Sequence, residues 1–449
     1  MKLSLNTLNQ EPKYLAALRI IDQLSENGYM AFLVGGCVRD RHMGFKPLDY
    51  DIACDALPEQ VSAVFAKKPF KVVPTGLEHG TMTVVFHAHA YELTTLRKDV
   101  ETDGRHAKVT FGSSLEEDAA RRDFTMNAMF ESRTGEVKDF FNGREHIARK
   151  QLIFVGEATE RIQEDYLRIM RFFRFKTRFN MTSDKKTLDA IKIHHEGLKD
   201  ISSERITKEM WGLLSCREVQ DDFRAIVDTK VMPLIFAKVD PKGVVFSHNE
   251  NLRDLGKLGS LNISSNELAY ARLAFICLRS GQKTLGFKDW DEKKLIAILK
   301  GFRLSNAQVQ KTLGAIVAFK ELPFLLQVDV AENLLFVDKL EVYGGKGVAT
   351  EFYFPFWANF FKRFCFEAKH QNSLRRLMQI EDSFGKRRLS KLPINGKEVM
   401  REFALNSGTE IGEALKFLKL AYLNGEWEKR EQGLVCLQHY FKGKDKSEQ

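Results

Sequence analysis

The sequence predicts an α+β head at the amino-terminal end, followed by a largely helical remainder. Up to about residue 156, short apolar or β-branched runs alternate with helical patterns. After about residue 157, strand signals become rare and long segments carry apolar residues at positions i, i+3 and i+4. The chain has 449 residues, enough for several domains of roughly 100–200 residues each. We expect four parts: a head over 1–156, a helical neck over 157–215, a helical body over 216–385 and a helical tail over 386–449.

Composition narrows the class of protein. Hydrophobic residues make up 44% and charged residues 29% of the chain, which is ordinary for a globular protein and does not indicate disorder. The six cysteines are scattered without a Cys-x-x-Cys pair, and the first residues lack a secretory leader, so we expect reduced thiols and a cytoplasmic protein. The aromatic run at 352–361 is about half the ~20 residues that a membrane span needs, so we expect no membrane insertion. The net charge of +9 fits a polyanionic partner.

The predicted elements follow the chain in a simple order. In the head, Met30–Val34 is typical of a buried strand that runs into a glycine turn, and Thr81–Phe86 with Tyr91–Leu96 is typical of a hairpin. Helical periodicity covers Pro58–Phe65. Beyond the head, helical patterns cover 162–175, 206–214, 267–278 and 411–423.

The glycine turn after the first strand is the first candidate for phosphate binding. In the segment Leu33–Asp40, a strand ends at Gly35 and Gly36 and a helix is expected to follow. Glycines let the backbone approach a phosphate, a helix N-terminus offers unpaired N–H donors, and Arg39 adds a charged fork. An ordinary tight turn produces the same pattern.

Two aspartates, Asp49 and Asp51, follow in the segment Leu48–Ala53. On a strand, alternate side chains share a face, so both carboxylates would point the same way. Crowded carboxylates repel unless a cation lies between them, and hard oxygen ligands suit Mg²⁺. An acidic, solvent-facing strand edge has the same spacing. Glu92, on the expected neighbouring strand, favours a catalytic site because three carboxylates and two metal ions can stabilise both the attacking and the leaving oxygen of an in-line displacement.

The segment Arg121–Asn127 groups further polar residues. Arg121 and Arg122 would bind phosphate oxygens in a bidentate manner, while Asp123 and Asn127 could contact ribose hydroxyls. A charged helix start capped by Asp123 is the alternative interpretation.

A helix expected over Arg161–Phe175 carries Asp165, Arg168, Arg171 and Arg174 at intervals of three, on one slowly spiralling stripe. A solvated helix with an Asp165–Arg168 pair is one interpretation. Base recognition is the other, because a carboxylate accepts from an exocyclic amine while arginine donates to a ring nitrogen, a combination that fits both cytosine and adenine.

Together these segments resemble the class II tRNA nucleotidyltransferases, the CCA-adding enzymes of the polymerase-β-like superfamily. The resemblance covers roughly residues 30–215, with a weaker match over about 390–425, and rests on the order of six motifs: Gly-Gly-x-x-Arg, Asp-x-Asp, Glu-Leu-Thr-Thr-Leu-Arg, Thr-Asp-Gly-Arg-His-Ala, Arg-Arg-Asp-Phe-Thr-x-Asn-Ala and Glu-Asp-x-x-Arg. It implies a head of the polymerase-β-like fold with a mixed sheet, followed by a helical neck, body and tail.

The resemblance also implies a role for each site residue. Asp49 and Asp51 would be the ligands of Mg²⁺, with Glu92 as the third catalytic carboxylate. The triphosphate would contact Gly35, Gly36 and Arg39 on one side and Arg121 or Arg122 on the other, with Asp123 and Asn127 near the ribose. Asp165 and Arg168 would form the amino-acid template for CTP and ATP, with Arg171 and Arg174 behind them. The segment 102–107 matches the family's flexible loop, and tRNA would be the partner.

Three other activities stay open. Poly(A) polymerases share the superfamily, although the stretch 73–83 resembles CCA-adding members, and we find no Gly-Arg-Arg-Phe segment here. An enzyme that adds only CC or only A is a second alternative, and a catalytically inactive RNA-binding module is a third. The sequence gives no residue-level function for 216–385 and leaves the oligomeric state open.

Overall fold

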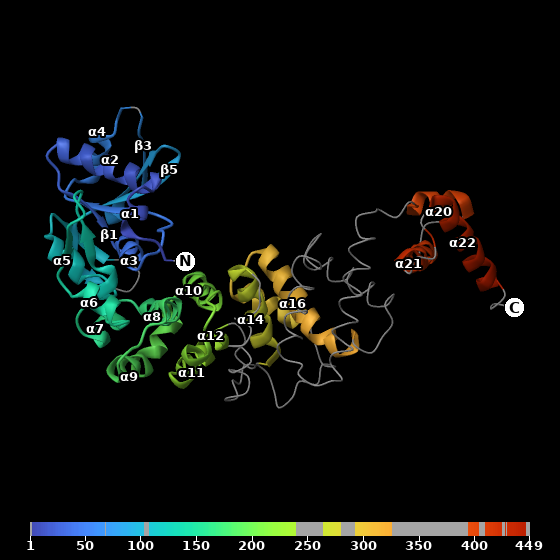
Figure 1. Ribbon diagram of the computed structural model, residues 1–449. Coiled ribbons are helices and arrows are strands. Elements are labelled where there is room, and N and C mark those ends of the chain that lie inside the picture. The colour runs from blue at the N-terminus through green and yellow to red at the C-terminus, as the bar shows by residue number, and fades with distance from the viewer. Residues whose placement is uncertain are drawn as a thin grey trace. The chain divides into compact units, whose positions relative to one another are not determined.

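The computed structural model describes residues 2–67, 69–102, 107–238, 264–279, 292–325, 394–403, 409–423, 427 and 429–445. Within these residues a mixed sheet is followed by helices, which confirms the predicted α+β class (Figure 1). The chain forms two compact units, one of Met1–Leu213 with Asp221–Lys238 and one of Leu214–Gln220 with Val239–Gln449.

A seven-stranded sheet with the order β3-β4-β5-β2-β1-β8-β9 forms the centre of the head. Its strands are β1 (Ala31–Val34), β2 (Asp51–Cys54), β3 (Lys71–Gly76), β4 (Thr81–Phe86), β5 (His89–Thr95), β8 (Met129–Glu131) and β9 (Val137–Asp139). All neighbouring pairs are antiparallel except β2 and β5, which run parallel. The predicted hairpin is confirmed, because β4 and β5 pair across a short turn.

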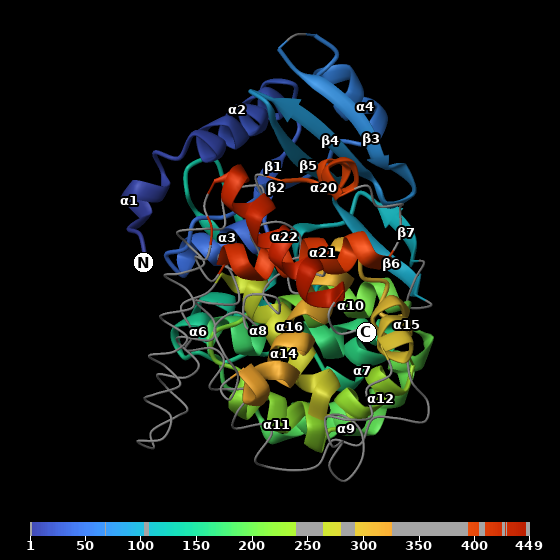
Figure 2. The ribbon, with the colours of Figure 1, turned by 90° about the vertical axis from the view of Figure 1, so that its right-hand side faces the viewer.

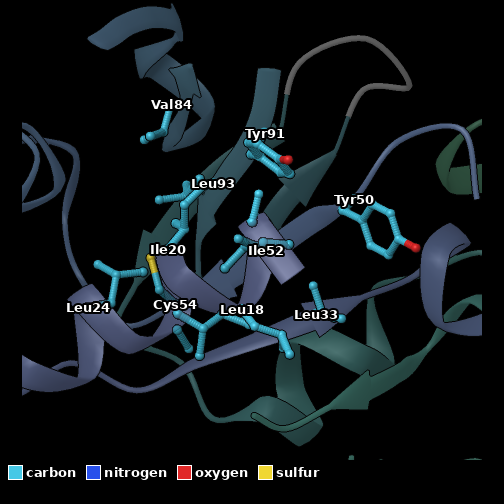
Figure 3. Close-up of a cluster of buried hydrophobic side chains, with 14 of the residues drawn as sticks. Leu18, Ile20, Leu24, Leu33, Tyr50, Ile52, Cys54, Val84, Tyr91 and Leu93 are labelled. Atoms are coloured by element: carbon cyan, nitrogen blue, oxygen red, sulfur yellow. The ribbon is translucent and has the colours of Figure 1, made fainter. Parts of the chain in front are cut away.

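The two faces of the sheet are covered differently. One face packs on the helices α2 (Pro12–Glu26) and α4 (Pro58–Val64) through a large buried cluster (Figure 3). That cluster includes alternate residues of the strands: Leu33, Ile52, Cys54, Met82, Val84, Tyr91 and Leu93. The intervening residues Val34 and Ala53 belong to a second cluster on the opposite face. Because Asp51 alternates with Ile52, its side chain lies on the face opposite α2.

Shorter elements complete the head. They are the helices α1 (Leu5–Leu8), α3 (Gly36–His42), α5 (Leu115–Ala120) and α6 (Gly143–Ala148), and the 3₁₀ turns η1 (Leu77–His79) and η2 (Thr125–Asn127). Strands β6 (Arg97–Thr102) and β7 (Ala107–Phe111) pair with each other in a separate ribbon (Figure 2). The expected flexible loop connects these two strands, and its residues 103–106 lie outside the described residues.

The rest of the first unit is helical. It contains α7 (Ala158–Glu164), α8 (Leu167–Phe179), α9 (Lys185–His194), the 3₁₀ turn η3 (His195–Asp200), α10 (Ser203–Leu214), α11 (Gln220–Asp228) and α12 (Val231–Ala237). Phenylalanines pack α8 against the head, where Phe172 and Phe175 contact Phe124 at 6.4 and 5.7 Å between ring centroids.

The single helix expected over Arg161–Phe175 is wrong, because two helices, α7 and α8, divide this segment. Asp165 has an extended backbone, with φ of −153° and ψ of 104°, and its carboxylate accepts a hydrogen bond from Leu167 N at 3.0 Å. An aspartate that bonds the backbone two residues ahead competes with helix continuation and starts a new helix. The continuous stripe of four charged residues therefore does not exist.

In the second unit the structure describes α14 (Ser265–Arg279), α15 (Glu292–Gly301), α16 (Asn306–Leu325), α20 (Gly396–Phe403), α21 (Thr409–Leu423) and α22 (Arg430–Asp445). The last three helices share a small core around the buried Trp427, whose indole N–H donates to Leu418 O at 3.0 Å. No helix among the described residues is long and apolar enough to cross a membrane.

Candidate active site

Asp51 and Glu92 face the same side of the sheet from adjacent strands. The parallel pairing of β2 and β5 places Asp51 opposite Glu92, and paired residues of neighbouring strands share a face. Burial, reinforced by the charges of Glu92 and Asp49, raises the pKa of Asp51 to about 6. The prediction that Glu92 occupies the neighbouring strand is confirmed. Asp49, Asp51 and Glu92 together are called the acidic edge below.

Asp49 lies just before β2 rather than in it, since that strand begins at Asp51. The expectation that Asp49 and Asp51 lie on one strand is therefore wrong, and strand alternation does not fix the direction of the Asp49 carboxylate. The Asp49 side chain is 81% exposed, and its Oδ1 lies 4.0 Å from Lys13 Nζ. Lys13 also donates to Leu48 O at 2.8 Å, so α2 fastens the segment that carries Asp49.

The acidic edge fits a hard divalent cation by its chemistry. All three donors are carboxylates. The pKa of Asp51 is raised first by burial and then by the charges of Glu92 and Asp49, and a bound cation would favour its ionised form. Within the described part of the chain, no three Asp, Glu, His or Cys side chains form a ready-made metal cluster. Mg²⁺ takes one or two carboxylates from a protein and fills its other positions with water and phosphate oxygens.

The glycine turn lies next to Arg122. Gly35 has a φ of +73°, and a Cβ built on it would lie 3.1 Å from Arg122 Nη1, so both the backbone conformation and the close approach require glycine. Gly36 then opens α3. Arg122 also acts on Asp51, since its charge lowers the pKa that burial raises. The structure therefore places Gly35 and Arg122 together beside the acidic edge.

Arg39 is buried in a polar network instead of facing solvent. Its guanidinium donates to Asp40 Oδ1 at 2.8 Å and to Asn127 Oδ1 at 2.6 Å. It also stacks on Phe175 and Phe179, at 5.0 and 4.8 Å from the ring centroids. These contacts tie α3 to η2 and α8, and a triphosphate contact of Arg39 stays a prediction.

The network continues through Asp123, a fully buried carboxylate. Asn127 Nδ2 donates to Asp123 Oδ1 at 2.9 Å, and Arg171 Nε donates to Oδ2 at 2.7 Å. Burial alone would raise the pKa of Asp123, but Arg171 and these hydrogen bonds outweigh burial and hold the pKa below its ordinary value. Asp123 is thus ionised and pairs with Arg171, and its contact with a ribose stays a prediction.

Glu209 of α10 closes the network on the far side. Its carboxylate accepts from Arg174 Nε and lies 3.9 Å from Arg171 Nη1. The predicted pair Arg171 and Arg174 is therefore held between Asp123 and Glu209. Arg39, Asp40, Asp123, Asn127, Arg171, Arg174 and Glu209 are called the arginine network below.

The candidate base-reading residues Asp165 and Arg168 are anchored by different partners. Asp165 Oδ2 accepts from Arg205 Nη2 at 2.7 Å. Arg168 donates to Glu164 at 2.6 Å and to the carbonyl oxygen of Arg121 at 3.0 Å. The sequence-based alternative of an Asp165–Arg168 ion pair is wrong for this structure. Each side chain is instead oriented by a neighbour, as residues that recognise a base need to be.

Sequence reasoning missed Arg205 and Glu209. They lie four residues apart on α10, so both project from one side of that helix. The sequence shows that charged residues recur along Glu204–Glu209, but a helix whose charged residues face solvent has the same pattern. Only the fold brings α10 against α8.

Two family models and several curated proteins are similar to this chain. Residues 31–153 match the model of the poly A polymerase head domain, and residues 180–242 match a probable RNA- and SrmB-binding site of polymerase A. The mitochondrial CCA tRNA nucleotidyltransferase 1 of Homo sapiens is 32% identical over 407 residues, which cover 90% of this chain and 85% of that protein. A CCA-adding enzyme of Bacillus cereus is 41% identical over 221 residues, 49% of this chain and 55% of that protein.

Among solved structures, the CCA-adding enzyme of Bacillus stearothermophilus in complex with CTP superposes with a TM-score of 0.73 at 29% identity. The superposition covers 98% of this chain and 100% of that one. The resemblance found from the six motifs is thereby confirmed at the level of the whole chain. The chain belongs to the family of CCA-adding tRNA nucleotidyltransferases.

Proposed function

We propose that this chain adds C, C and A to the 3′ end of tRNA from CTP and ATP, without a nucleic-acid template. The observation that carries the proposal is the 32% identity to a CCA tRNA nucleotidyltransferase over 90% of the chain. The pairing of Asp51 with Glu92 beside the glycine turn supports it, because this geometry suits transfer of a nucleotidyl group.

In the proposed reaction the 3′-hydroxyl of tRNA attacks the α-phosphorus, and pyrophosphate leaves. Asp49 and Asp51 would hold Mg²⁺, which when bound offsets the negative charge that develops on the phosphate oxygens. A second magnesium ion, as the family resemblance implies, would share these carboxylates. Glu92 lies beside Asp51 and is exposed, so its carboxylate can orient the attacking hydroxyl or accept its proton.

The remaining residues would bind the nucleotide. Gly35, Gly36 and Arg122 surround the position proposed for the triphosphate, while Asp165 and Arg168 would read the base. A carboxylate and a guanidinium in fixed orientations present an acceptor and a donor, which matches the amine and ring nitrogen that cytosine and adenine share. Arg171, Arg174 and Asp123 would support this pair from behind, because the arginine network holds them in place.

An incorporation assay tests the proposal. Purified protein is incubated with tRNA that ends before CCA, with CTP and ATP supplied singly and together. We expect addition of two residues with CTP alone and of three with both nucleotides. Long A tails with ATP alone would instead identify a poly(A) polymerase, the activity that the head-domain match names. Addition that stops after CC, or A addition restricted to tRNA ending in CC, would identify an enzyme of partial activity.

For the location, we propose the cytoplasm. The buried cysteines Cys37 and Cys54 are free thiols, which suits a compartment that keeps thiols reduced. The human relative is named as mitochondrial, so fractionation of the source cells with an antibody decides between the two compartments.

A further inference from the structure

A single buried carboxylate, Asp118, holds Arg121 and Arg122, the two arginines predicted to contact the triphosphate. Its side chain is 1% exposed. Oδ1 accepts from Arg121 Nε and Nη2 at 2.9 and 2.6 Å, and Oδ2 accepts from Arg122 Nε and Nη2 at 3.2 and 2.9 Å. Each oxygen therefore receives two charge-assisted hydrogen bonds from one guanidinium, which orient both arginines.

This arrangement fixes the direction of each guanidinium and leaves some of its N–H donors available. An arginine carries five N–H donors, and Asp118 takes the Nε and one Nη2 donor of each fork. The other three donors, including both of Nη1, point away from Asp118. For Arg122, Nη1 lies over the glycine turn, 3.1 Å from where a Gly35 Cβ would be. Phe130 supports the same guanidinium at 5.5 Å from its ring centroid.

The charges of this triad favour an anion. One carboxylate faces two guanidiniums, so the triad keeps a net positive charge, and Arg122 brings its guanidinium next to Gly35. Burial by itself raises the pKa of Asp118, but Arg122 and Arg121 outweigh burial and keep the pKa below its ordinary value. Asp118 is therefore ionised at neutral pH and stays a firm acceptor for both forks.

The backbone of this segment is also anchored. Arg161 Nη1 donates to Ala120 O at 2.9 Å, and Arg168 Nη2 donates to Arg121 O at 3.0 Å. These bonds occupy carbonyls at the C-terminal end of α5, where such groups lack helical partners. With the backbone fixed by α7 and α8, the directions of Arg121 and Arg122 depend on Asp118.

We propose that Asp118 is a positioning residue that aims Arg121 and Arg122 at the triphosphate of the incoming nucleotide. This inference rests on the proposed function. Because the triphosphate is common to all nucleotides, the effect of Asp118 extends equally to CTP and ATP, and it spares both base choice and tRNA affinity. A displacement of about 1 Å at a binding group can change rates by about 100-fold, so the aim of these forks matters.

Two variants of the full-length enzyme test the proposal. Asp118→Glu keeps the charge but moves the carboxylate by one methylene, and Asp118→Asn removes the charge so that one fork loses its acceptor. We expect KM to rise about tenfold or more for CTP and ATP alike, at the scale seen when a partner of a ligand-binding group is removed. Inhibition by pyrophosphate should weaken by a similar factor, while the CTP-to-UTP preference and the KM for tRNA stay unchanged. Asp22→Asn, which breaks an exposed Asp–Arg pair with Arg133, is the matched control.

A merely structural role gives a different result. If Asp118 only supports folding, both variants lower the thermal midpoint and the active fraction, while KM for nucleotides and the pyrophosphate inhibition constant stay at their wild-type values. That outcome overturns the proposal. Asp118→Glu guards against a folding failure of Asp118→Asn, since it retains the buried ion pairs.

The double variant Arg121→Ala, Arg122→Ala separates this proposal from the proposed function. If the wild-type protein adds no nucleotides to tRNA, the proposed function fails. Suppose instead that the wild type is active and that the arginine variant raises KM while the Asp118 variants do not. In that case only the inference on Asp118 fails. We expect Asp118→Asn to add less than about twofold to the KM of the arginine double variant, because residues that act through one another are not additive.

Discussion

The acidic edge and the arginine network lie in the same unit and handle charge in opposite ways. In the network, Arg39, Arg171 and Arg174 face Asp40, Asp123 and Glu209, so positive and negative groups match in number. In the acidic edge, Asp51 and Glu92 are paired across β2 and β5, and Asp49 is exposed just before β2. The recorded cations here are Lys13, 4.0 Å from Asp49, and Arg122, whose charge lowers the pKa of Asp51. The network is thus paired within the protein, whereas the edge keeps carboxylates that we propose to hold a cation from outside. We therefore expect the network to position the elements of the fold and the edge to bind a ligand.

The difference has an energetic basis. A buried ion pair whose hydrogen bonds are all made fixes the relative position of its elements, and breaking it leaves an uncompensated buried charge. A cluster of like charges is destabilising by itself and is kept where a ligand relieves the repulsion. Removing a member should therefore affect stability in the network and activity in the edge.

The largest effect is expected at the edge. The double variant Asp49→Ala, Asp51→Ala should lower CCA incorporation by at least about 10³-fold, the upper scale for one well-placed electrostatic stabiliser. Its thermal midpoint in metal-free buffer should equal or exceed that of the wild type, because mutual repulsion is gone. Incorporation at the wild-type level would show that the carboxylates are not the catalytic site.

The network should respond in the opposite sense. Asp123→Ala leaves Arg171 buried without its nearest partner and should destabilise the first unit by about 3–5 kcal/mol, the usual cost of breaking a buried pair. Chemical denaturation followed by circular dichroism measures this change. Asp49→Ala, at an exposed site, should change the free energy of unfolding by less than about 1 kcal/mol. A smaller loss for Asp123→Ala than for Asp49→Ala would contradict the distinction between the two regions.

Arg168 belongs to neither group clearly. It donates to Glu164 and to the backbone of Arg121, and it is also proposed to recognise the base. Arg168→Ala should reduce the preference for CTP over UTP and for ATP over GTP by about 10–100-fold, because a good base contact contributes about 1–3 kcal/mol. Steady-state kcat/KM with each nucleotide measures it, beside the Kd for tRNA.

Arg178→Ala, on the same helix and paired with Asp40, is the control for loss of charge on α8. If Arg168→Ala weakens tRNA binding and leaves nucleotide choice unchanged, Arg168 belongs to the structural network.

The sequence was informative where function depends on local pattern. The strand before Gly35 and the hairpin that carries Glu92 were predictable, because turns and β-branched runs are local features. The placement of Asp49 on one strand with Asp51 was wrong, because β2 begins only at Asp51. The break at Asp165 was not readable, since apolar periodicity continues through it and the competing side-chain hydrogen bond is set by two adjacent residues.

Contacts between side chains of distant segments also could not be predicted from the sequence. Arg205 reaches Asp165 across 40 positions and Glu209 reaches Arg174 across 35. Which face of α10 meets α8 depends on packing of the whole unit, which no short pattern encodes. Asp118 is an intermediate case, because its spacing of three and four to Arg121 and Arg122 suits helical ion pairs, but its burial decides its role.

The smallest effect concerns the pH dependence of the edge. The pKa of Asp51 in the folded protein is raised from 3.8 to about 6, so the folded state takes up a proton before the unfolded state does. The ionised carboxyl therefore opposes folding; this cost is fully present above about pH 6 and is relieved as the pH falls from 6 toward 3.8. With chelator present, Asp51→Asn should raise the thermal midpoint of the first unit by about 2–4 °C near neutral pH, the shift that ~1 kcal/mol produces in a unit of this size.

Near pH 5 that gain should shrink, because the wild-type carboxyl is then mostly protonated. Added Mg²⁺ reverses the order at neutral pH: the wild type gains stability by binding the ion, and the variant, which lacks the charge, gains less. A gain from Asp51→Asn that is the same at both pH values would mean that ionisation of Asp51 is not its source. Magnesium that stabilises both proteins equally would place the cation elsewhere. The edge is thus distinguished from the arginine network by a sign: its charge costs stability in the absence of a ligand and contributes stability in its presence, whereas the charges of the network stabilise the fold in both conditions.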